Sequence, residues 1–238
     1  MIESKKNRRV CVVIGAGPGN GAAVARRFAD GGYHVALIAR DPAKLEALAA
    51  TMPNAAAFAC DATDPAALKS VLTDVEARIG AVSTLIYNAG KGVWGDALSI
   101  NETIFENAWR LNALGCFAAA RAVLPSMLNS GEGSVVIMGA TASRRGGADA
   151  VAFAAAKGAL RLLAESLARA YGPRGVHVAL LIIDAVVGEP LMRAKLADRG
   201  DYFFCMPRDI AETAYMLAHQ PRSAWTFECE LRPFAEKW

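Results

Sequence analysis

Short apolar runs rich in β-branched residues alternate with stretches of helical periodicity along the whole chain. The runs predicted to be strands are Val10–Ile14, His34–Ala39, Ala56–Cys60, Thr84–Tyr87, Ser134–Met138, Val176–Ile182 and Trp225–Glu230. The longest helical stretches are Asn101–Leu128 and Ala148–Tyr171. Continuous apolar strands separated by helices are typical of a parallel sheet that helices cover on both faces. The pattern therefore predicts an α/β fold in three layers, with a doubly wound parallel sheet of seven strands.

Composition and charge narrow the class of protein. With 54% hydrophobic residues and a net charge of +3, the chain is expected to be globular and is not expected to bind nucleic acid. Charged residues or glycines interrupt every apolar run before roughly 18 residues, which predicts no membrane span. The sequence has no repeat and no linker-like segment, so we expect one domain over residues 1–238.

The five cysteines are scattered along the chain and form no C-x-x-C pair. This spacing predicts reduced, buried thiols and neither a disulfide framework nor a metal site. Reduced thiols favour a cytoplasmic location.

A glycine cluster follows the first predicted strand and leads into a helical run. Gly15, Gly19 and Gly21 fit the spacing G-x-x-x-G-x-G, with Asn20 between the last two. Glycines let the backbone approach a pyrophosphate, and the following helix presents N–H groups and the positive end of its dipole. A tight turn without a ligand is the alternative, but four glycines in seven residues favour a dinucleotide site and a Rossmann-like fold.

The residues after the second strand bear on the choice of dinucleotide. Arg40 follows that strand, and Asp41 comes next, before Pro42. A carboxylate at this place accepts from the ribose 2′-hydroxyl of NAD(H), whereas an arginine accommodates the 2′-phosphate of NADP(H). Asp41 is already accounted for as a helix cap before a first-turn proline. We therefore expect NADP(H) rather than NAD(H).

Several further motifs occur in the order found in the short-chain dehydrogenase/reductase family, which the chain resembles over essentially its whole length. These are the Gly15–Gly21 turn, Asp61 after the third strand, Asn88-Ala89-Gly90 after the fourth, Asn112 in a long helix, and Lys157. The resemblance implies that Asp61 and Ala62 contact adenine, that Asn88, Ala89 and Gly90 line the cofactor, and that Lys157 grips the nicotinamide ribose. It also implies hydride transfer between a nicotinamide and a carbonyl or alcohol, and a lid-like segment near residues 188–205.

The centre of the resemblance departs from the family pattern. A tyrosine four residues before the lysine is the family's general acid/base, and here that position holds Phe153. Counting back by the family's usual spacing places Ala140 where a serine would orient the substrate. Phenylalanine has no proton to give, so the ordinary mechanism requires a substitute donor.

Three residues are candidates for that donor. Asp184 stands among apolar neighbours, which predicts a raised pKa, although a strand-end turn residue is the alternative. Tyr202 lies in the lid-like segment, where an aromatic residue more often forms only a pocket wall. Lys157 itself is the third, with a pKa lowered by apolar neighbours. The family's Pro-Gly and Thr after the sixth strand are absent from the stretch at 182–188, which affects the nicotinamide pocket.

Two functions remain open. The first is an NADP(H)-dependent oxidoreductase that acts on a carbonyl-type small molecule through Lys157, Asn112 and Asp184. The second is a catalytically inactive NADP(H)-binding protein with a regulatory or scaffolding role. The resemblance also implies a homodimer or homotetramer assembled through the helices at 101–128 and 148–171.

Overall fold

Apolar side chains alternate between the two faces of the first strand, as an extended backbone requires. In the computed structural model, which describes residues 8–235, Val10, Val12 and Ile14 of β1 (Val10–Ile14) join one apolar cluster. Cys11 and Val13 join another on the opposite face. Each face of the sheet therefore has its own core.

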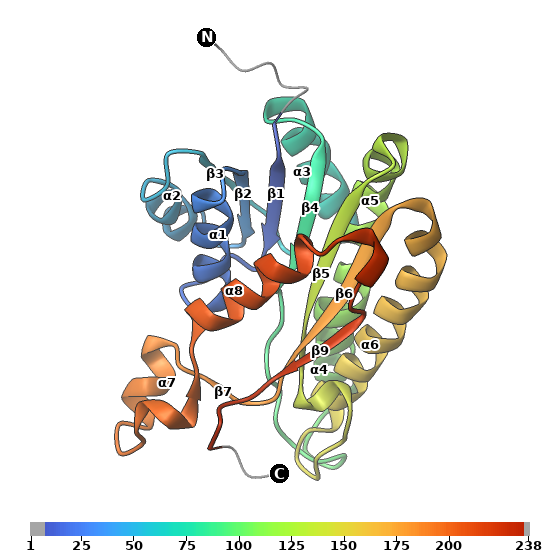
Figure 1. The fold of residues 1–238 in the computed structure, drawn as a ribbon. Coiled ribbons are helices and arrows are strands. Elements are labelled where there is room, and N and C mark those ends of the chain that lie inside the picture. Colours follow the sequence, from blue (N-terminus) through green and yellow to red (C-terminus); the bar gives the residue numbers. More distant parts are fainter. Residues whose placement is uncertain (1–7, 236–238) are drawn as a thin grey trace.

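Seven parallel strands form the main sheet, in the order β3-β2-β1-β4-β5-β6-β9 (Figure 1). Besides β1, they are β2 (His34–Ala39), β3 (Ala55–Ala59), β4 (Val82–Tyr87), β5 (Gly133–Ala140), β6 (Val176–Ile183) and β9 (Glu228–Leu231). A separate pair consists of β7 (Val186–Val187) and β8 (Phe204–Cys205). The order reverses at β1 and β4, and a crevice is expected there beyond the carboxyl ends of the strands.

Helices cover both faces of the main sheet and confirm the predicted doubly wound, three-layered fold (Figure 1). One face packs against α1 (Asn20–Asp30), α2 (Pro42–Ala49) and α8 (Pro207–Ala218). The other packs against α3 (Pro65–Arg78), α5 (Gly115–Ser130) and α6 (Val151–Tyr171), with α4 (Glu102–Trp109) packed against α6. The short α7 (Pro190–Lys195) lies beyond β7.

The predicted helix over Asn101–Leu128 is present as a continuous helical stretch, Glu102–Ser130, but its middle has different geometry. A π-helical turn at Arg110–Leu114 joins α4 to α5. The second long helix begins at Val151 rather than at Ala148, because the preceding residues form a turn in which Ala150 N–H donates to the Gly147 carbonyl at 3.1 Å. Both differences arise from local backbone hydrogen bonds that apolar periodicity does not reveal.

The last strand also begins later than predicted, at Glu228 instead of Trp225. The Trp225 ring stacks on His177 with centroids 4.9 Å apart, and its indole N–H donates to the Gln220 carbonyl. Trp225 therefore belongs to the connection that leads into β9. The cysteines are free thiols and four of the five are buried, in agreement with the sequence analysis.

Candidate active site

A cleft of about 950 Å³ opens at the carboxyl ends of the central strands. These strand ends form the lower edge of the sheet in Figure 1. Loops that follow β1 through β6 contribute to its walls. All the residues predicted to contact a cofactor line it: Gly15, Gly19, Asn20, Gly21, Arg40, Asp61, Ala62, Asn88, Ala89, Gly90 and Lys157. The fold thus brings together segments that are spread over more than half of the sequence.

The glycine turn is shaped by close backbone contacts. Gly15 has φ +88°, and a Cβ there would lie 2.6 Å from the Ala89 amide nitrogen. At Gly21 a Cβ would lie 2.2 Å from the Gly15 carbonyl oxygen, an atom that also accepts from Asn88 Nδ2 at 2.8 Å. Larger residues are excluded at both positions. No described side chain caps the start of α1, and its first residues, Asn20 and Gly21, line the cleft. The start of a helix favours an anion.

Arg40 and Asp41 have different surroundings at the end of β2. Asp41 caps α2, because its carboxylate accepts from the Lys44 amide at 3.2 Å and pairs with Lys44 Nζ at 3.0 Å. Arg40 lines the cleft. Opposite it, hydrogen bonds from Thr63 lower the pKa of Asp61, and Arg40 lowers that pKa further.

Asn112 and Lys157 lie together beneath the loop after β4. Lys157 Nζ donates to the Met138 carbonyl at 2.9 Å, and Asn112 Nδ2 donates to the Ala108 carbonyl at 2.9 Å. A Cβ on Gly90 would lie 3.1 Å from Asn112 Oδ1 and 3.3 Å from Lys157 Nζ. The Oδ1 atom is buried and has no hydrogen-bond partner among the described residues, so it is available to a further donor. Burial lowers the pKa of Lys157 to about 8.

Phe153 lines the cleft near this pair. Its ring centroid lies 5.9 Å from Lys157 Nζ and 5.9 Å from the ring centroid of Trp94. Ala140 ends β5, and its N–H donates to Ser143 Oγ at 3.1 Å. The wall beside Lys157 is therefore largely apolar.

Asp184 lies in surroundings that differ from the apolar ones expected from its sequence neighbours. It is buried, but Arg232 Nη2 contacts its carboxylate at 2.7 Å, Arg145 Nη2 lies 3.6 Å away, and Thr141 donates a hydrogen bond. The side chain does not line the large cleft. It lines a second cavity of about 300 Å³ beside it. Arg232 is 48 residues away in the sequence, so this ion pair could not be predicted from the residues near Asp184.

Comparison with known proteins identifies the family. The chain matches the short chain dehydrogenase family over residues 9–198. It belongs to the short-chain dehydrogenase family. It is 29% identical to 2-(S)-hydroxypropyl-CoM dehydrogenase 3 of Xanthobacter autotrophicus, over 91% of each chain. It is 30% identical to the inactive 2-(S)-hydroxypropyl-CoM dehydrogenase 2 of the same organism, over 82% of this chain and 90% of that protein.

A solved structure of a metagenomic short-chain oxidoreductase in complex with NADP is similar throughout. The two chains are 28% identical, the match covers 98% of this chain and 100% of the other, and the TM-score is 0.83. The seven-stranded sheet described above is thus shared by this short-chain dehydrogenase family member and a structure that holds NADP.

The lid-like segment of this family member forms part of the cleft wall. Within residues 188–205, Glu189 lines the cleft, next to Val187 at the end of β7, whereas Tyr202 does not line it and is 59% exposed. A Cβ on Gly19 would lie 2.7 Å from Glu189 Oε2, so this carboxylate approaches the start of α1. Glu189 and Arg145 were not predicted from the sequence. Glu189 lies in the stretch after β6 that departs from the family pattern, whereas the adjacent pair Arg144-Arg145, shortly after β5, was a visible signal.

One helical segment of this family member qualifies as a membrane span by length and composition alone. This segment is Glu102–Ser130. The sequence analysis predicted no membrane span there, because charged residues and glycines interrupt its apolar runs. Half of its most apolar window is buried inside the protein, and α5 packs against α3, β4 and β5. Such burial is typical of a core helix.

Proposed function

We propose that this protein is an NADP(H)-dependent oxidoreductase that interconverts a carbonyl group and an alcohol on a small molecule. The observation that best supports this proposal is that Lys157 Nζ lies beside Asn112 Oδ1, which has no partner among the described residues. Both atoms lie within 3.3 Å of the position that a Cβ on Gly90 would take. Together with the glycine turn, this pair provides a phosphate cradle and a polar end in one cleft. When bound there, NADP(H) would supply or accept the hydride.

NADP(H) is proposed over NAD(H) because of the charges beside β2. Arg40 lines the cleft, where a guanidinium suits a 2′-phosphate. The Asp41 carboxylate is already engaged by Lys44 and does not line the cleft. A ribose 2′-hydroxyl would therefore find no free carboxylate from Asp41.

We infer that Phe153 and Ala140 replace the tyrosine and serine that are typical of the family, and that Lys157 donates the proton in reduction. Of the three candidate donors, Lys157 alone lines the large cleft. Asp184 is held by arginines in the second cavity, and Tyr202 is exposed. A pKa of about 8 leaves Lys157 mostly protonated near neutral pH but able to release its proton. Asn112 Oδ1, which has no partner among the described residues, is available beneath the same loop to accept from a group bound beside the lysine.

The alternative function is NADP(H) binding without catalysis, in a regulatory or scaffolding protein. The apolar wall formed by Phe153 and Ala140 favours it, because neither side chain exchanges a proton. A relative that is 30% identical is itself named as inactive, which supports this alternative.

We further propose a homodimer or homotetramer that forms through the helices at 101–128 and 148–171. Large apolar side chains are exposed on their outer faces, among them Phe105, Trp109, Phe117 and Leu162. Exposed apolar residues on neighbouring helices favour association with a second copy. We also propose that the chain is a single domain with a lid over residues 188–205. Its location is proposed to be cytoplasmic, which is consistent with the free thiols.

The decisive experiment compares binding with turnover. NADPH is titrated into the purified protein, and NADPH consumption is then followed with a panel of aldehydes, ketones and quinones. Turnover with at least one class supports the oxidoreductase. Tight binding with no turnover favours the inactive alternative, and absence of binding contradicts both. In the double variant Phe153→Tyr, Ala140→Ser, new or increased turnover would show that the pocket still accepts a carbonyl substrate.

A further inference from the structure

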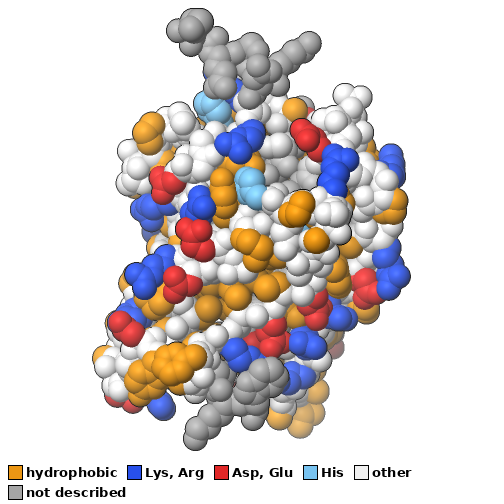
Figure 2. Space-filling view, viewed as in Figure 1, with side chains coloured by type: hydrophobic (Ala, Val, Ile, Leu, Met, Phe, Trp, Pro, Cys, Tyr) orange, Lys and Arg blue, Asp and Glu red, His pale blue; other side chains and the backbone are white. Residues whose placement is uncertain are grey.

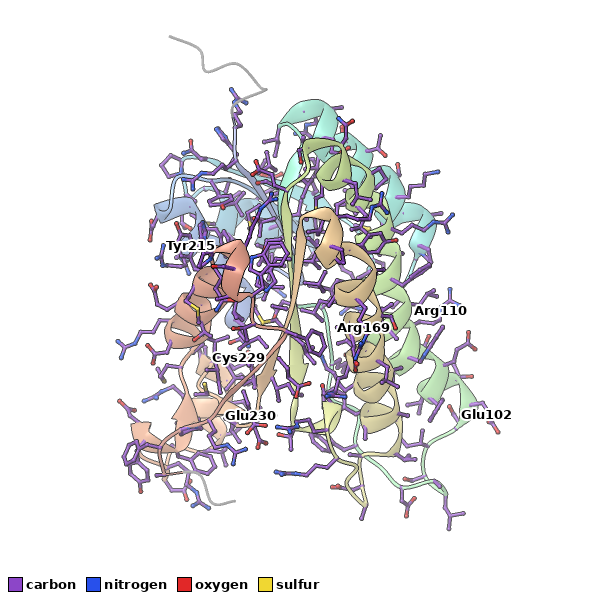
Figure 3. The ribbon with its side chains drawn as sticks, turned by 45° about the vertical axis from the view of Figure 1, so that its right-hand side comes forward. Glu102, Arg110, Arg169, Tyr215, Cys229 and Glu230 are labelled. Carbon is purple, nitrogen blue, oxygen red and sulfur yellow. The ribbon has the colours of Figure 1, made fainter. Side chains whose placement is uncertain are left out.

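The second cavity beside the cleft is lined almost entirely by charged side chains. Its walls are Thr141, Arg144, Arg145, Asp184, Glu230 and Arg232. Glu230 lies on β9 next to Cys229, and Figure 3 shows both near the lower end of that strand. Figure 2 shows acidic and basic side chains gathered in the lower part of the molecule. Three arginines against two carboxylates leave one positive charge in excess.

The ion pairs assign that excess to Arg145. Arg232 Nη2 binds Asp184 at 2.7 Å and also contacts Glu230. Arg144 Nη1 binds Glu230 at 2.6 Å. Both carboxylates of the cavity are thus neutralised without Arg145, whose nearest acidic atom among the described residues is Asp184 Oδ1 at 3.6 Å. That distance is too long for a hydrogen bond.

Arg145 is also placed between the two cavities. Together with Thr141 it lines both the large cleft and the smaller cavity. Its backbone N–H donates to the Thr141 carbonyl at 3.3 Å, which holds it in the turn after β5. Its side chain is 64% exposed and therefore able to meet an arriving ligand.

We propose that Arg145 binds an acid group on the substrate, so that the protein prefers carbonyl compounds carrying a carboxylate or a phosphate. This rests on the proposed oxidoreductase function. An anion in the second cavity pairs with Arg145 without breaking the shorter bonds of Arg144 and Arg232. Because the cavity adjoins the cleft at Thr141, the rest of the same molecule extends towards Phe153 and Lys157, which line the cleft.

The test compares aldehydes that share a reacting group and differ in charge. The probes are 4-formylbenzoate, 4-formylphenyl phosphate and the neutral methyl 4-formylbenzoate. Their dissociation constants are measured by calorimetry with NADP⁺-loaded protein, and KM is measured with NADPH. We expect the better anion to bind about tenfold more tightly than the ester, as one charge-assisted hydrogen bond provides. The two anions distinguish a carboxylate from a phosphate substrate.

Variants separate the role of Arg145 from a general effect of charge. Arg145→Gln is expected to remove most of the preference for the anion and to leave binding of the ester unchanged, whereas Arg145→Lys retains part of the preference. Arg208→Gln, at an exposed arginine that lines neither cavity, is expected to change nothing.

Equal binding of the anions and the ester, or an anion preference that survives Arg145→Gln, would overturn the proposal. If NADP(H) does not bind at all, the proposed function fails, and the same calorimetric comparison on the free protein still decides whether Arg145 recognises an anion.

Discussion

Lys157 donates a hydrogen bond from Nζ to the carbonyl oxygen of Met138 at 2.9 Å, which ties the second turn of α6 to the end of β5. This bond fixes a buried ammonium group at the floor of the cleft. Burial favours its neutral form and lowers the pKa to about 8, within the range where a lysine exchanges protons at physiological pH.

The rate of carbonyl reduction is therefore expected to fall as the pH rises through about 8, because the ammonium form is the one that gives up a proton. Oxidation of the alcohol should show the opposite trend. Lys157→Met is expected to lower kcat/KM by about 100-fold or more and to remove the inflection. Lys91→Met, which also changes a lysine of the cleft, serves as the control. A profile that is unchanged in Lys157→Met would assign the proton to another group.

Arg40→Ala is expected to shift the ratio of NADPH to NADH affinity towards NADH by about tenfold, since a charge-assisted contact to phosphate is lost. The ratio is measured by fluorescence titration of both cofactors. Asp41→Asn should leave it unchanged and preserve the cap of α2, because an asparagine oxygen still accepts from the Lys44 amide. If Arg40→Ala does not alter the ratio, this arginine does not select the cofactor.

Glu189→Gln is expected to increase NADPH affinity severalfold. The carboxylate of Glu189 approaches Gly19 at the start of α1, where the dipole favours an anion and the cofactor would place its pyrophosphate. Removal of the negative charge relieves repulsion between the two anions. The dissociation constant of NADPH is compared with that of Glu132→Gln, an exposed glutamate that does not line the cleft. A weaker affinity in Glu189→Gln would show instead that the carboxylate assists binding.

The stability of the fold is expected to decrease as the pH falls through about 6.5. Burial lowers the pKa of His177 below its usual 6.5, and its Nε2 donates to the Thr226 carbonyl at 2.9 Å. The unfolded chain then binds more protons than the native state below pH 6.5, so acid favours unfolding. Urea unfolding at about pH 7.5 and about pH 5.5 measures the decrease in the free energy of unfolding between the two pH values. His177→Gln should make this decrease smaller, and His34→Gln should leave it unchanged. An equal loss in both variants would assign it to other groups.

Patterns that depend on neighbouring residues were predictable from the sequence. The strand at Val10–Ile14 and the one at His34–Ala39 have the predicted bounds, and the residues that follow parallel strands meet in one cleft. Contacts between distant segments were not predictable. The pairing of Asp184 with Arg232 and the approach of Glu189 to Gly19 depend on tertiary packing, and the π-turn at Arg110–Leu114 leaves no trace in apolar periodicity.

The central claim is that the cleft between the Gly15–Gly21 turn and Lys157 is an NADP(H) site. Calorimetric titration of NADPH, with NADH in a parallel run, tests it most directly. The account predicts one site per chain, tighter for NADPH than for NADH, with an affinity for NADPH that falls in Arg40→Ala. Absence of binding for both nucleotides, in protein shown by circular dichroism to be folded, would contradict it.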